Sequence, residues 1–462
     1  MSSTIQICQL NIPFDSRAFF AKISHQPWAM LLDSGNSGHD DAKVDIIVYQ
    51  PLVTLLTQDD QTQVVDHQAQ TSFISNENPF DLVATQLEQS ELSSEPTELP
   101  FSGGAVGHFS YDLGRQCERL ESKAEKDIAL AEMAIGIYQH AILFCHKEQS
   151  VRLVSRTNTH AHQERKAQIL ELVTQAAKPR HCELTTPWQH QLSFEQYASR
   201  FNKVQHYLRQ GDCYQINLTQ RFEAQYQGDE YAAYLQLADN NNMPFSAFIR
   251  LPQGAILSVS PERFMQSRHG NVQAKPIKGT RPRSDDPKVD KMLANELLSS
   301  EKDQSENLMI VDLLRNDLGR CALPGSVCVP KLFDIESFKN VHHLVSTVEA
   351  KLPPQTSPLT LLKGAFPGGS ITGAPKIRAM NIIDELEPHR RSIYCGSIGY
   401  VSADQQMDTN ITIRTLLCLD NKIYCWAGGG IVADSTVADE YQECFDKVAS
   451  ILPILAPNKD KL

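Results

Sequence analysis

GDCYQINLTQRF, residues 211–222, is the stretch that decides the fold class. Apolar and polar residues alternate through most of it, which is typical of a half-buried β-strand. A helical pattern precedes it at about 194–210, and two further apolar runs follow near Ala247–Arg250 and Ala255–Val259, with no helical pattern between those two. Strands that follow one another in this way form antiparallel sheets. We therefore predict an α+β fold built on large antiparallel β-sheets.

The same alternation of patterns extends over the rest of the chain. Residues 1–84 have short apolar runs between turn residues, which predicts a β-rich beginning. Residues 85–100, TQLEQSELSSEPTELP, are acidic and polar, as in a solvated loop or linker. We expect an N-terminal β-rich part, residues 1–190, and a C-terminal part, residues 191–456. Other strands are expected near Ile135–Cys145, Val151–Val154, Ser397–Val401, Asn410–Cys418 and Ile423–Ala427, and other helices at about 160–176, 287–300, 303–318, 375–386 and 436–451.

The composition limits the class of protein. The chain has 462 residues, of which 41% are hydrophobic and 21% charged, as in soluble globular proteins. Its net charge of -12 argues against nucleic acid and anionic membranes as partners, because both reward a basic surface. The N-terminus has no signal-peptide pattern, no segment is apolar enough to span a membrane, and the eleven cysteines form no CxxC pair. We therefore expect a cytoplasmic protein with reduced thiols.

The basic stretch AKPIKGTRPR, residues 274–283, contrasts with this acidic chain. Lys278 follows an extended Pro-Ile pair and precedes a Gly-Thr turn, a setting that presents a side chain inward or into a cleft. Glu262 lies sixteen residues earlier, in SPERF, and the two could face one cleft if their segments are adjacent strands. A buried salt bridge is one interpretation, and a general acid beside a desolvated lysine nucleophile is the other. His343, in NVHHLVSTV, could join them or be structural.

Two helical segments carry carboxylates. Glu443 and Lys447 stand four residues apart in VADEYQECFDKVASIL, which fits either a surface ion pair or a Mg²⁺ ligand beside a lysine that meets an anion. Glu306 begins ENLMIVDLLRNDLGR, an apolar run interrupted by charged residues such as Asp312 and Asp317. Charges inside an apolar helix need a partner or a metal, so core salt bridges and a Mg²⁺ site are both open.

Two glycine-rich stretches favour close contact with an anion. They are PGGSITGAPKIRAM, residues 367–380, and CWAGGGIVADS, residues 425–435. Glycine lets the backbone approach a ligand closely, and N–H groups at the start of a helix attract negative charge. A tight turn explains either stretch alone. Together with the nearby cations, they indicate a substrate that bears carboxylates or phosphates.

These motifs together resemble the chorismate-utilising enzymes, the family of anthranilate synthase component I and aminodeoxychorismate synthase component I. The resemblance spans nearly the whole chain. It implies a pair of orthogonally packed antiparallel β-sheets flanked by helices, with the two parts of the chain intertwined in one large domain. The motifs that carry it are LLDS (31–34), FSGGAVGHFSYDLGR (101–115), GDCYQINL (211–218), SPERF (260–264), PIKGTRPR (276–283), ENLMIVDLLRNDLGR (306–320), HHLVS (342–346), PGGSITGAPKIRAM (367–380), GSIGY (396–400), IRT (413–415), AGGGIVADS (427–435) and YQECFDK (441–447).

Two positions narrow the resemblance. Anthranilate synthases carry alanine where this chain has Lys278, whereas a lysine there marks the aminodeoxychorismate synthases. Gln215 stands where the isochorismate and salicylate synthases carry a lysine base, and glutamine fits ammonia as the nitrogen source. The resemblance therefore implies amination of chorismate by ammonia to 4-amino-4-deoxychorismate, for 4-aminobenzoate and folate biosynthesis.

The resemblance also implies a role for each site residue. Lys278 would attack C2 of chorismate while Glu262 protonates the departing 4-hydroxyl, and ammonia would then enter at C4 and expel the lysine. Glu306 and Glu443 would hold Mg²⁺ at the ring carboxylate, and His343 would orient the substrate or polarise the leaving side. The implied chorismate contacts are Gly279, Thr280, Tyr400, Arg414, Gln215, Gly428, Gly429, Gly430 and Lys447.

Two further binding partners follow from the resemblance. The chain lacks a Gly-x-Cys-x-Gly glutaminase motif, so ammonia is expected from a separate glutamine amidotransferase subunit in a heterodimer. The family also has a tryptophan pocket, and Ser34, Pro244, Phe245 and Ser246 match it, so we expect bound L-tryptophan. Core packing around Trp28 and Phe245 is the alternative.

Two rival functions remain open. Anthranilate synthase component I would also eliminate pyruvate from chorismate. A non-catalytic regulator that binds tryptophan or an anion would keep the fold without the chemistry. The set Glu262, Lys278, Glu306 and Glu443 argues against the regulator, because a binding module has no need of an acid, a nucleophile and two metal ligands.

Overall fold

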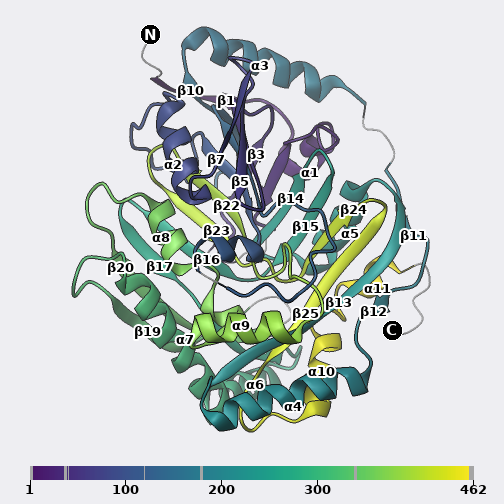
Figure 1. Cartoon of the computed structure of the whole chain (residues 1–462). Coiled ribbons are helices and arrows are strands. Elements are labelled where there is room, and N and C mark those ends of the chain that lie inside the picture. Colours follow the sequence, from purple (N-terminus) through teal and green to yellow (C-terminus); the bar gives the residue numbers. More distant parts are fainter. Residues whose placement is uncertain are drawn as a thin grey trace.

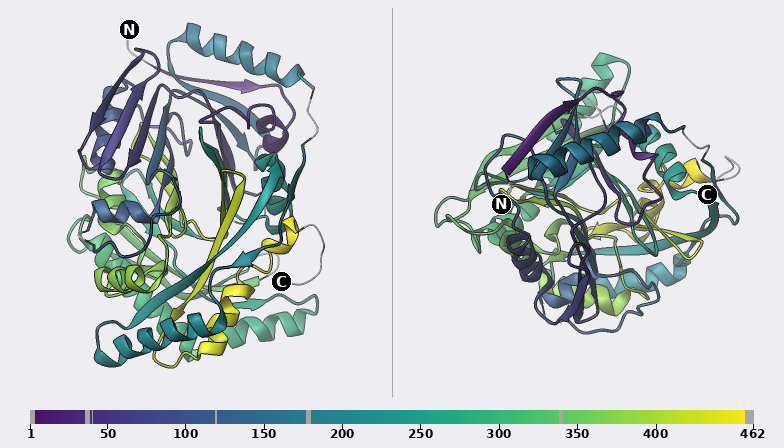
Figure 2. Two further views of the ribbon diagram at one scale, coloured as in Figure 1. Left: turned by 45° about the vertical axis from the view of Figure 1, so that its right-hand side comes forward. Right: turned by 90° about the horizontal axis from the view of Figure 1, so that it is seen from above.

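Two large antiparallel sheets form the protein, and helices flank them (Figures 1 and 2). The computed structural model describes residues 4–35, 39, 41–118, 120–176, 180–337 and 341–456. Buried side chains from both sheets meet in one hydrophobic cluster. The prediction of an α+β fold with large antiparallel sheets is confirmed.

The first sheet has thirteen strands within the described residues. Its named strand pairs run antiparallel. In spatial order the strands are β1 (Thr4–Leu10), β10 (Ser150–Thr157), β9 (His140–Cys145), β3 (Val44–Val48), β2 (Met30–Asp33), β14 (Phe245–Arg250), β15 (Gly254–Ser260), β24 (Thr415–Leu419), β25 (Lys422–Ile431), β13 (Gln215–Gly228) and β11 (Cys182–Leu184), with β12 (Gln189–His190) and β21 (Gly373–Ala374) also paired to β13.

The second sheet has twelve strands in the same described ranges and is also antiparallel. Their order is β18 (Ile277–Pro282), β20 (Val341–Lys351), β17 (Asn271–Ala274), β16 (Arg263–Arg268), β23 (Met407–Asn410), β22 (Ser397–Ser402), β7 (Gly104–Phe109), β8 (Met133–Tyr138), β4 (Val53–Gln58), β5 (Gln61–Asp66) and β6 (Thr71–Ser75), with β19 (Cys328–Ser337) paired to β20.

The helices that matter for the site gather at one end of the molecule, at the lower edge of Figure 1. Helix α7 packs against β18 and β20, α9 against β13, and α10 against β25. Within the described ranges, no helix combines the length and the apolar character that a membrane span requires. The helices are α1 (Ser16–Phe20), α2 (Pro79–Gln89), η1 (Tyr111–Gln116), α3 (Thr159–Thr174), α4 (Phe194–Gln210), α5 (Glu230–Asn241), α6 (Pro287–Leu298), α7 (Glu301–Gly319), α8 (Pro358–Ala365), η2 (Gly369–Ile371), α9 (Lys376–Leu386), α10 (Val437–Asp446) and α11 (Leu452–Leu455).

Helix α4 delivers the chain to β13. It begins with a capping box in which Ser193 and Gln196 bond each other's backbone, and Tyr197, Phe201 and Val204 are buried at helical spacing. Gly211 ends the helix in the left-handed conformation, with φ of 76°. Because the helix ends there, the alternating stretch that follows is free to extend as β13.

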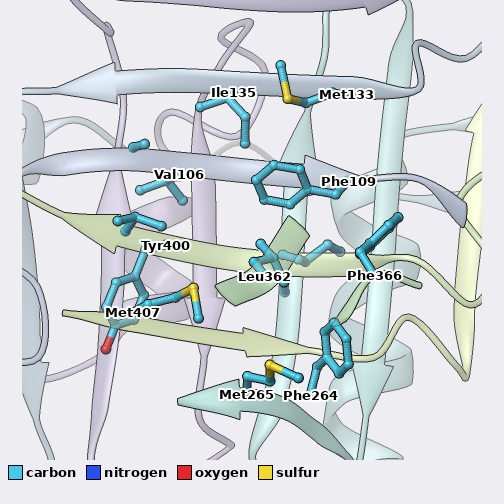
Figure 3. Packing of buried hydrophobic residues seen from close by; sticks show 14 of the residues in the cluster. Val106, Phe109, Met133, Ile135, Phe264, Met265, Leu362, Phe366, Tyr400 and Met407 are labelled. Carbon is cyan, nitrogen blue, oxygen red and sulfur yellow. The ribbon is translucent and has the colours of Figure 1, made fainter. Parts of the chain in front are cut away.

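The core of the second sheet shows the order of its central strands. In Figure 3, Ile135 of β8, Val106 of β7, Tyr400 of β22, Met407 of β23 and Met265 of β16 come from successive strands. All five side chains are buried. This packing joins strands from distant parts of the sequence, so neither half of the chain completes the sheet alone.

Two crossovers connect the sheets beside the site. The chain passes from β15 of the first sheet to β16 of the second, and it returns from β23 to β24. The Ile411 N–H donates to the Glu262 carbonyl at 3.0 Å, and the Ser260 hydroxyl donates to the Ile411 carbonyl at 2.6 Å. These bonds hold Glu262 at the junction of the two sheets.

Two sequence-based boundaries differ from the structure. The stretch 85–100 is not a free linker, because its first residues belong to α2 and its remainder is held by buried groups. Arg156 donates to the Glu95 carbonyl at 3.0 Å, and Gln406 donates to the Leu99 carbonyl at 3.0 Å. The strand expected over Asn410–Cys418 is divided, because residues 411–414 form the return crossover.

Candidate active site

Glu262 is buried at the junction, with 6% of its surface exposed. Burial raises the pKa of its carboxyl to about 7, and the charge of Lys278 opposes part of that rise. Hydrogen bonds from the Ile277 backbone and the Ser370 side chain also favour the ionised form. At neutral pH the carboxyl therefore exists both protonated and ionised, which suits a general acid.

Lys278 lies on β18 beside a β-bulge. The register with β20 shifts between Lys278 and Thr280, and Gly279 at this shift has φ of 75°. A Cβ atom at position 279 would lie 2.7 Å from Leu297 Cδ1 and 2.8 Å from Asp303 Cγ, so the position requires glycine. Bulges change the direction of neighbouring side chains. The Gly-Thr turn seen in the sequence is thus the bulge that orients Lys278.

The surroundings of Lys278 are charged, and Lys278 itself is half-buried. Burial lowers the pKa of its amine; the carboxylates of Glu306, Glu262 and Glu443 oppose that effect, and the Lys447 cation adds to it. These five side chains therefore interact electrostatically in one place. The sequence suggested that Glu262 and Lys278 meet if their segments are adjacent strands. In the structure, β18 and β16 are not adjacent, since β20 and β17 lie between them.

Helix α10 places Glu443 and Lys447 against the glycine run of β25. Glu443 Oε1 lies 2.6 Å from Lys447 Nζ, and Lys447 donates to the Gly428 carbonyl at 2.7 Å. The ion pair that one interpretation of the sequence expected on the surface is therefore formed. Lys447 also connects this pair to the glycine run of β25 through its bond to Gly428. Both side chains keep more than two fifths of their surface exposed, so a ligand can reach them.

The three glycines of β25 leave room that side chains would fill. A Cβ atom at Gly429 would lie 2.4 Å from Glu440 Oε2 and 3.1 Å from Glu443 Oε1. At Gly428 it would lie 2.2 Å from the Leu218 carbonyl oxygen, and at Gly430 1.9 Å from Gln215 Nε2. Only glycine allows the α10 carboxylates and the Gln215 amide to lie this close to β25.

His343 lies on β20, the strand next to β18, and interacts electrostatically with Arg414. His343 Nδ1 and Thr280 Oγ1 form a hydrogen bond of 2.9 Å across β20 and β18. Burial, together with the Arg414 charge, lowers the pKa of His343 to about 4, so the ring is neutral at pH 7. Burial also lowers the pKa of Arg414. A neutral imidazole beside a desolvated guanidinium suits the orientation of an anionic substrate.

The charged residues of α7 divide between surface and core. Arg315 and Asp312 form an exposed ion pair of 2.9 Å. Asp317 is buried and pairs with Lys376 at 2.8 Å. The Asp317–Lys376 pair is the core salt bridge of one interpretation, whereas the Asp312–Arg315 pair lies on the surface. Glu306 differs, because burial raises the pKa of its carboxyl and the Lys278 charge opposes that rise.

A second group of expected residues lines a separate cavity of about 260 Å³. Ser34, Pro244, Phe245 and Ser246 all contribute to its wall, as expected for one pocket. The Ser34 hydroxyl donates to Asp45 at 2.7 Å. Lys278, Glu262, Glu306 and Glu443 do not line this cavity.

Tyr400 lines this second cavity. The sequence prediction placed it against chorismate. Tyr400 lies on β22, between β23 and β7, and its ring packs on Phe101 with centroids 5.3 Å apart. A contact between Tyr400 and chorismate stays a prediction.

Three site residues were not singled out from the sequence. Ser370 bonds the Glu262 carboxyl, Glu440 lies over Gly429, and Asn217 lies opposite Gly430 on the neighbouring strand. Glu440 was visible on the α10 stripe with Glu443, and Asn217 stands two residues after Gln215. Ser370 gave no signal beyond its glycine-rich surroundings.

The fold and the residues around Lys278 together indicate the class of protein. The chain belongs to the family of chorismate binding enzymes, whose model matches residues 29–453.

Relatives narrow the class further. The chain is 50% identical over 457 residues to aminodeoxychorismate synthase component 1 of Salmonella typhimurium, covering 98% of this chain and 99% of that protein. It is 51% identical over 436 residues to the protein of the same name from Escherichia coli, covering 94% of each. Among solved structures, anthranilate synthase component I of Streptococcus pneumoniae has a TM-score of 0.79 and 31% identity, over 89% of this chain and 92% of that one.

Proposed function

We propose that this chain aminates chorismate at C4 with ammonia to give 4-amino-4-deoxychorismate, for 4-aminobenzoate and folate biosynthesis. Full-length relatives at half identity that carry the name aminodeoxychorismate synthase component 1 support this proposal. The observation that carries it is the amine of Lys278 at the β18 bulge, whose pKa burial lowers and which interacts electrostatically with Glu306, Glu262 and Glu443.

In the proposed mechanism Lys278 is the nucleophile. Its neutral amine attacks C2, the ring double bonds shift, and the C4–O bond breaks as Glu262 gives its proton to the departing hydroxyl. Ammonia then attacks C4, the double bonds shift back, and the C2–N bond to Lys278 breaks. Overall, chorismate and ammonia give the aminated product and water. A covalent intermediate divides one difficult displacement into two easier ones.

The pKa shifts fit these roles. Burial works against the charged form of both Lys278 and Glu262, so it favours the neutral amine and the protonated acid that the first step needs. The two groups also attract each other when ionised, which is the salt-bridge form. Entry of a substrate that excludes water favours the neutral pair.

We propose Glu306 and Glu443 as the ligands of Mg²⁺, with Glu440 beside them. Glu440 is 5% exposed, and its Oε2 has no hydrogen-bond partner among the described residues. One or two carboxylates and an anionic substrate are the surroundings that Mg²⁺ prefers, so the donor set fits. Mg²⁺ bound there would act as a Lewis acid toward the ring carboxylate.

The remaining residues would position chorismate. Arg414 offers two N–H groups to a carboxylate, and the neutral His343 with Thr280 would orient the ring beside Lys278. The backbone at Gly279 and at Gly428 to Gly430 would allow close approach of the substrate, and Lys447 would meet its negative charge. Gln215 would face the incoming nitrogen.

Two further partners belong to this proposal. Ammonia would come from a separate glutamine amidotransferase subunit, which the designation component 1 of the relatives supports. L-Tryptophan would occupy the second cavity, whose wall includes Phe245, Arg263 and Asp41; Arg263 pairs with Asp41 at 2.9 Å and lies 4.8 Å over the Phe245 ring.

The test uses the purified chain with chorismate, ammonium chloride and Mg²⁺. We expect a product with the mass of 4-amino-4-deoxychorismate, which an added lyase converts to 4-aminobenzoate. Fluorescent anthranilate formed without a lyase would refute the proposal. Lys278→Ala, with Lys275→Ala as the matched control on the same basic stretch, should abolish product only at position 278.

A further inference from the structure

The strand β13 presents two amide side chains on one face. Gln215 and Asn217 are two residues apart, and alternate residues of a strand share a face. Gln215 is 2% exposed and Asn217 is 9% exposed. The backbone of Asn217 is fixed on both sides, because its N–H donates to the Thr372 carbonyl at 2.9 Å and its carbonyl accepts from Arg391 at 2.6 Å. The Asn217 side chain is therefore not needed to hold the strand.

Both amides border the same glycine of β25. Asn217 pairs directly with Gly430, and the Gln215 side chain bends toward this glycine until its Nε2 lies 1.9 Å from where a Cβ atom would stand. Side chains that lie opposite each other in an antiparallel pair have Cβ atoms roughly 5 Å apart. The Gln215 amide therefore fills the position above Gly430, and Asn217 lies opposite the same glycine.

The side-chain oxygens of both neighbouring amides are buried. Within the described part of the chain, neither Gln215 Oε1 nor Asn217 Oδ1 has a hydrogen-bond partner. Buried polar atoms are nearly always paired, so two such oxygens at one place indicate a polar ligand that donates hydrogen bonds. Lys447, which bonds Gly428 on the same strand as Gly430, links this part of β25 to the group around Lys278.

We infer that Asn217 is a specificity-determining residue that receives the attacking ammonia together with Gln215. This inference rests on the proposed amination and adds a second acceptor to it. Ammonia donates up to three hydrogen bonds and attacks through its single lone pair, so two acceptor oxygens hold it by N–H groups and leave that lone pair free. As the C4–N bond forms, the nitrogen becomes positive, and the same oxygens stabilise that charge.

The test separates nitrogen binding from chorismate binding. Asn217→Leu keeps the approximate size of the side chain and removes both polar atoms. With ammonium chloride as nitrogen source and chorismate saturating, we expect the KM for ammonium to rise about tenfold. The KM for chorismate at saturating ammonium should change less than twofold, because the group around Lys278 is intact. Gln225→Leu, on an exposed position of the same strand, is the matched control and should change neither value.

The outcomes are distinct. An ammonium KM within twofold of the wild type, or an equal rise in both KM values, would overturn the inference, since a structural role moves both together. If Asn217→Leu does not fold, Asn217→Ser takes its place with an expected rise of about threefold in the ammonium KM alone. A wild-type chain that makes no aminated product at all would refute the proposed function itself. An active wild type with an unchanged ammonium KM in Asn217→Leu would refute only the role of Asn217.

Discussion

Replacement of Glu262 by glutamine tests two claims at once. One is that Glu262 is the general acid of the proposed reaction, and the other is that burial raises the pKa of its carboxyl. Glutamine has nearly the same shape but cannot give up a proton at the departing hydroxyl. Loss of a general acid costs about 10²- to 10⁴-fold in rate, so we expect kcat for Glu262→Gln to fall by that much. The measurement is ammonium-dependent product formation by mass at pH 7, with saturating chorismate.

The same substitution has the opposite effect on stability at high pH. The pKa of Glu262 rises from 4.5 to about 7 in the folded chain, which corresponds to roughly 3 kcal/mol against ionisation at 1.36 kcal/mol per unit. Between these two values the folded state binds more protons than the unfolded state, so this group makes wild-type stability fall as pH rises. Glutamine does not ionise. The free energy of unfolding of Glu262→Gln should therefore gain up to about 3 kcal/mol on the wild type between pH 4.5 and 8.

Denaturant unfolding of both proteins at several pH values in that range checks the second effect. A difference between them that stays constant with pH would show that Glu262 is not held in a desolvated place. A kcat within threefold of the wild type would show that it is not the acid. Either result would refute the reasoning about this residue.

Three further predictions follow from particular contacts. Gly429→Ala places a methyl group 2.4 Å from Glu440 Oε2, so we expect the Mg²⁺ concentration for half-maximal activity to rise about tenfold. Titration with Mg²⁺ after a chelator has removed metal measures this concentration. An unchanged concentration would contradict the prediction. Arg391→Met leaves the buried Glu387 carboxylate without the partner 2.6 Å away, which should cost about 3–5 kcal/mol of unfolding free energy; a loss under 1 kcal/mol would count against it. Wild-type kcat/KM should decline above pH 7 as Glu262 ionises, and a profile flat to pH 9 would contradict that assignment.

The local parts of this structure were predictable because short-range patterns decide them. The capping box at Ser193 and the left-handed Gly211 fix α4, and the alternation after Gly211 fixes β13. Glu443 and Lys447 are four residues apart on one helix, so their contact follows from helical geometry alone. Strand patterns that follow one another without a helical pattern between them then predicted the antiparallel sheets.

The long-range parts were not predictable from one sequence in physical terms. Glu262 lies at a crossover between the sheets, and two strands separate β16 from the β18 strand that carries Lys278. The periodicity of a sequence does not predict which strands become neighbours in this way. Tyr400 was matched to chorismate by family resemblance, and nothing in the sequence showed that it lines the second cavity, because a strand pattern gives alternation but does not say which cavity each face meets. The acidic stretch 85–100 looked like a linker because its composition does not reveal that Arg156 and Gln406 bond its backbone.

The most direct measurement of the central claim is the mass of the intact protein after brief exposure to chorismate and Mg²⁺ with no nitrogen source. The account predicts a mass increase equal to chorismate minus one water, on a peptide that contains Lys278, and its disappearance when ammonium is added. An unmodified Lys278 in wild-type protein that still makes the aminated product would contradict it.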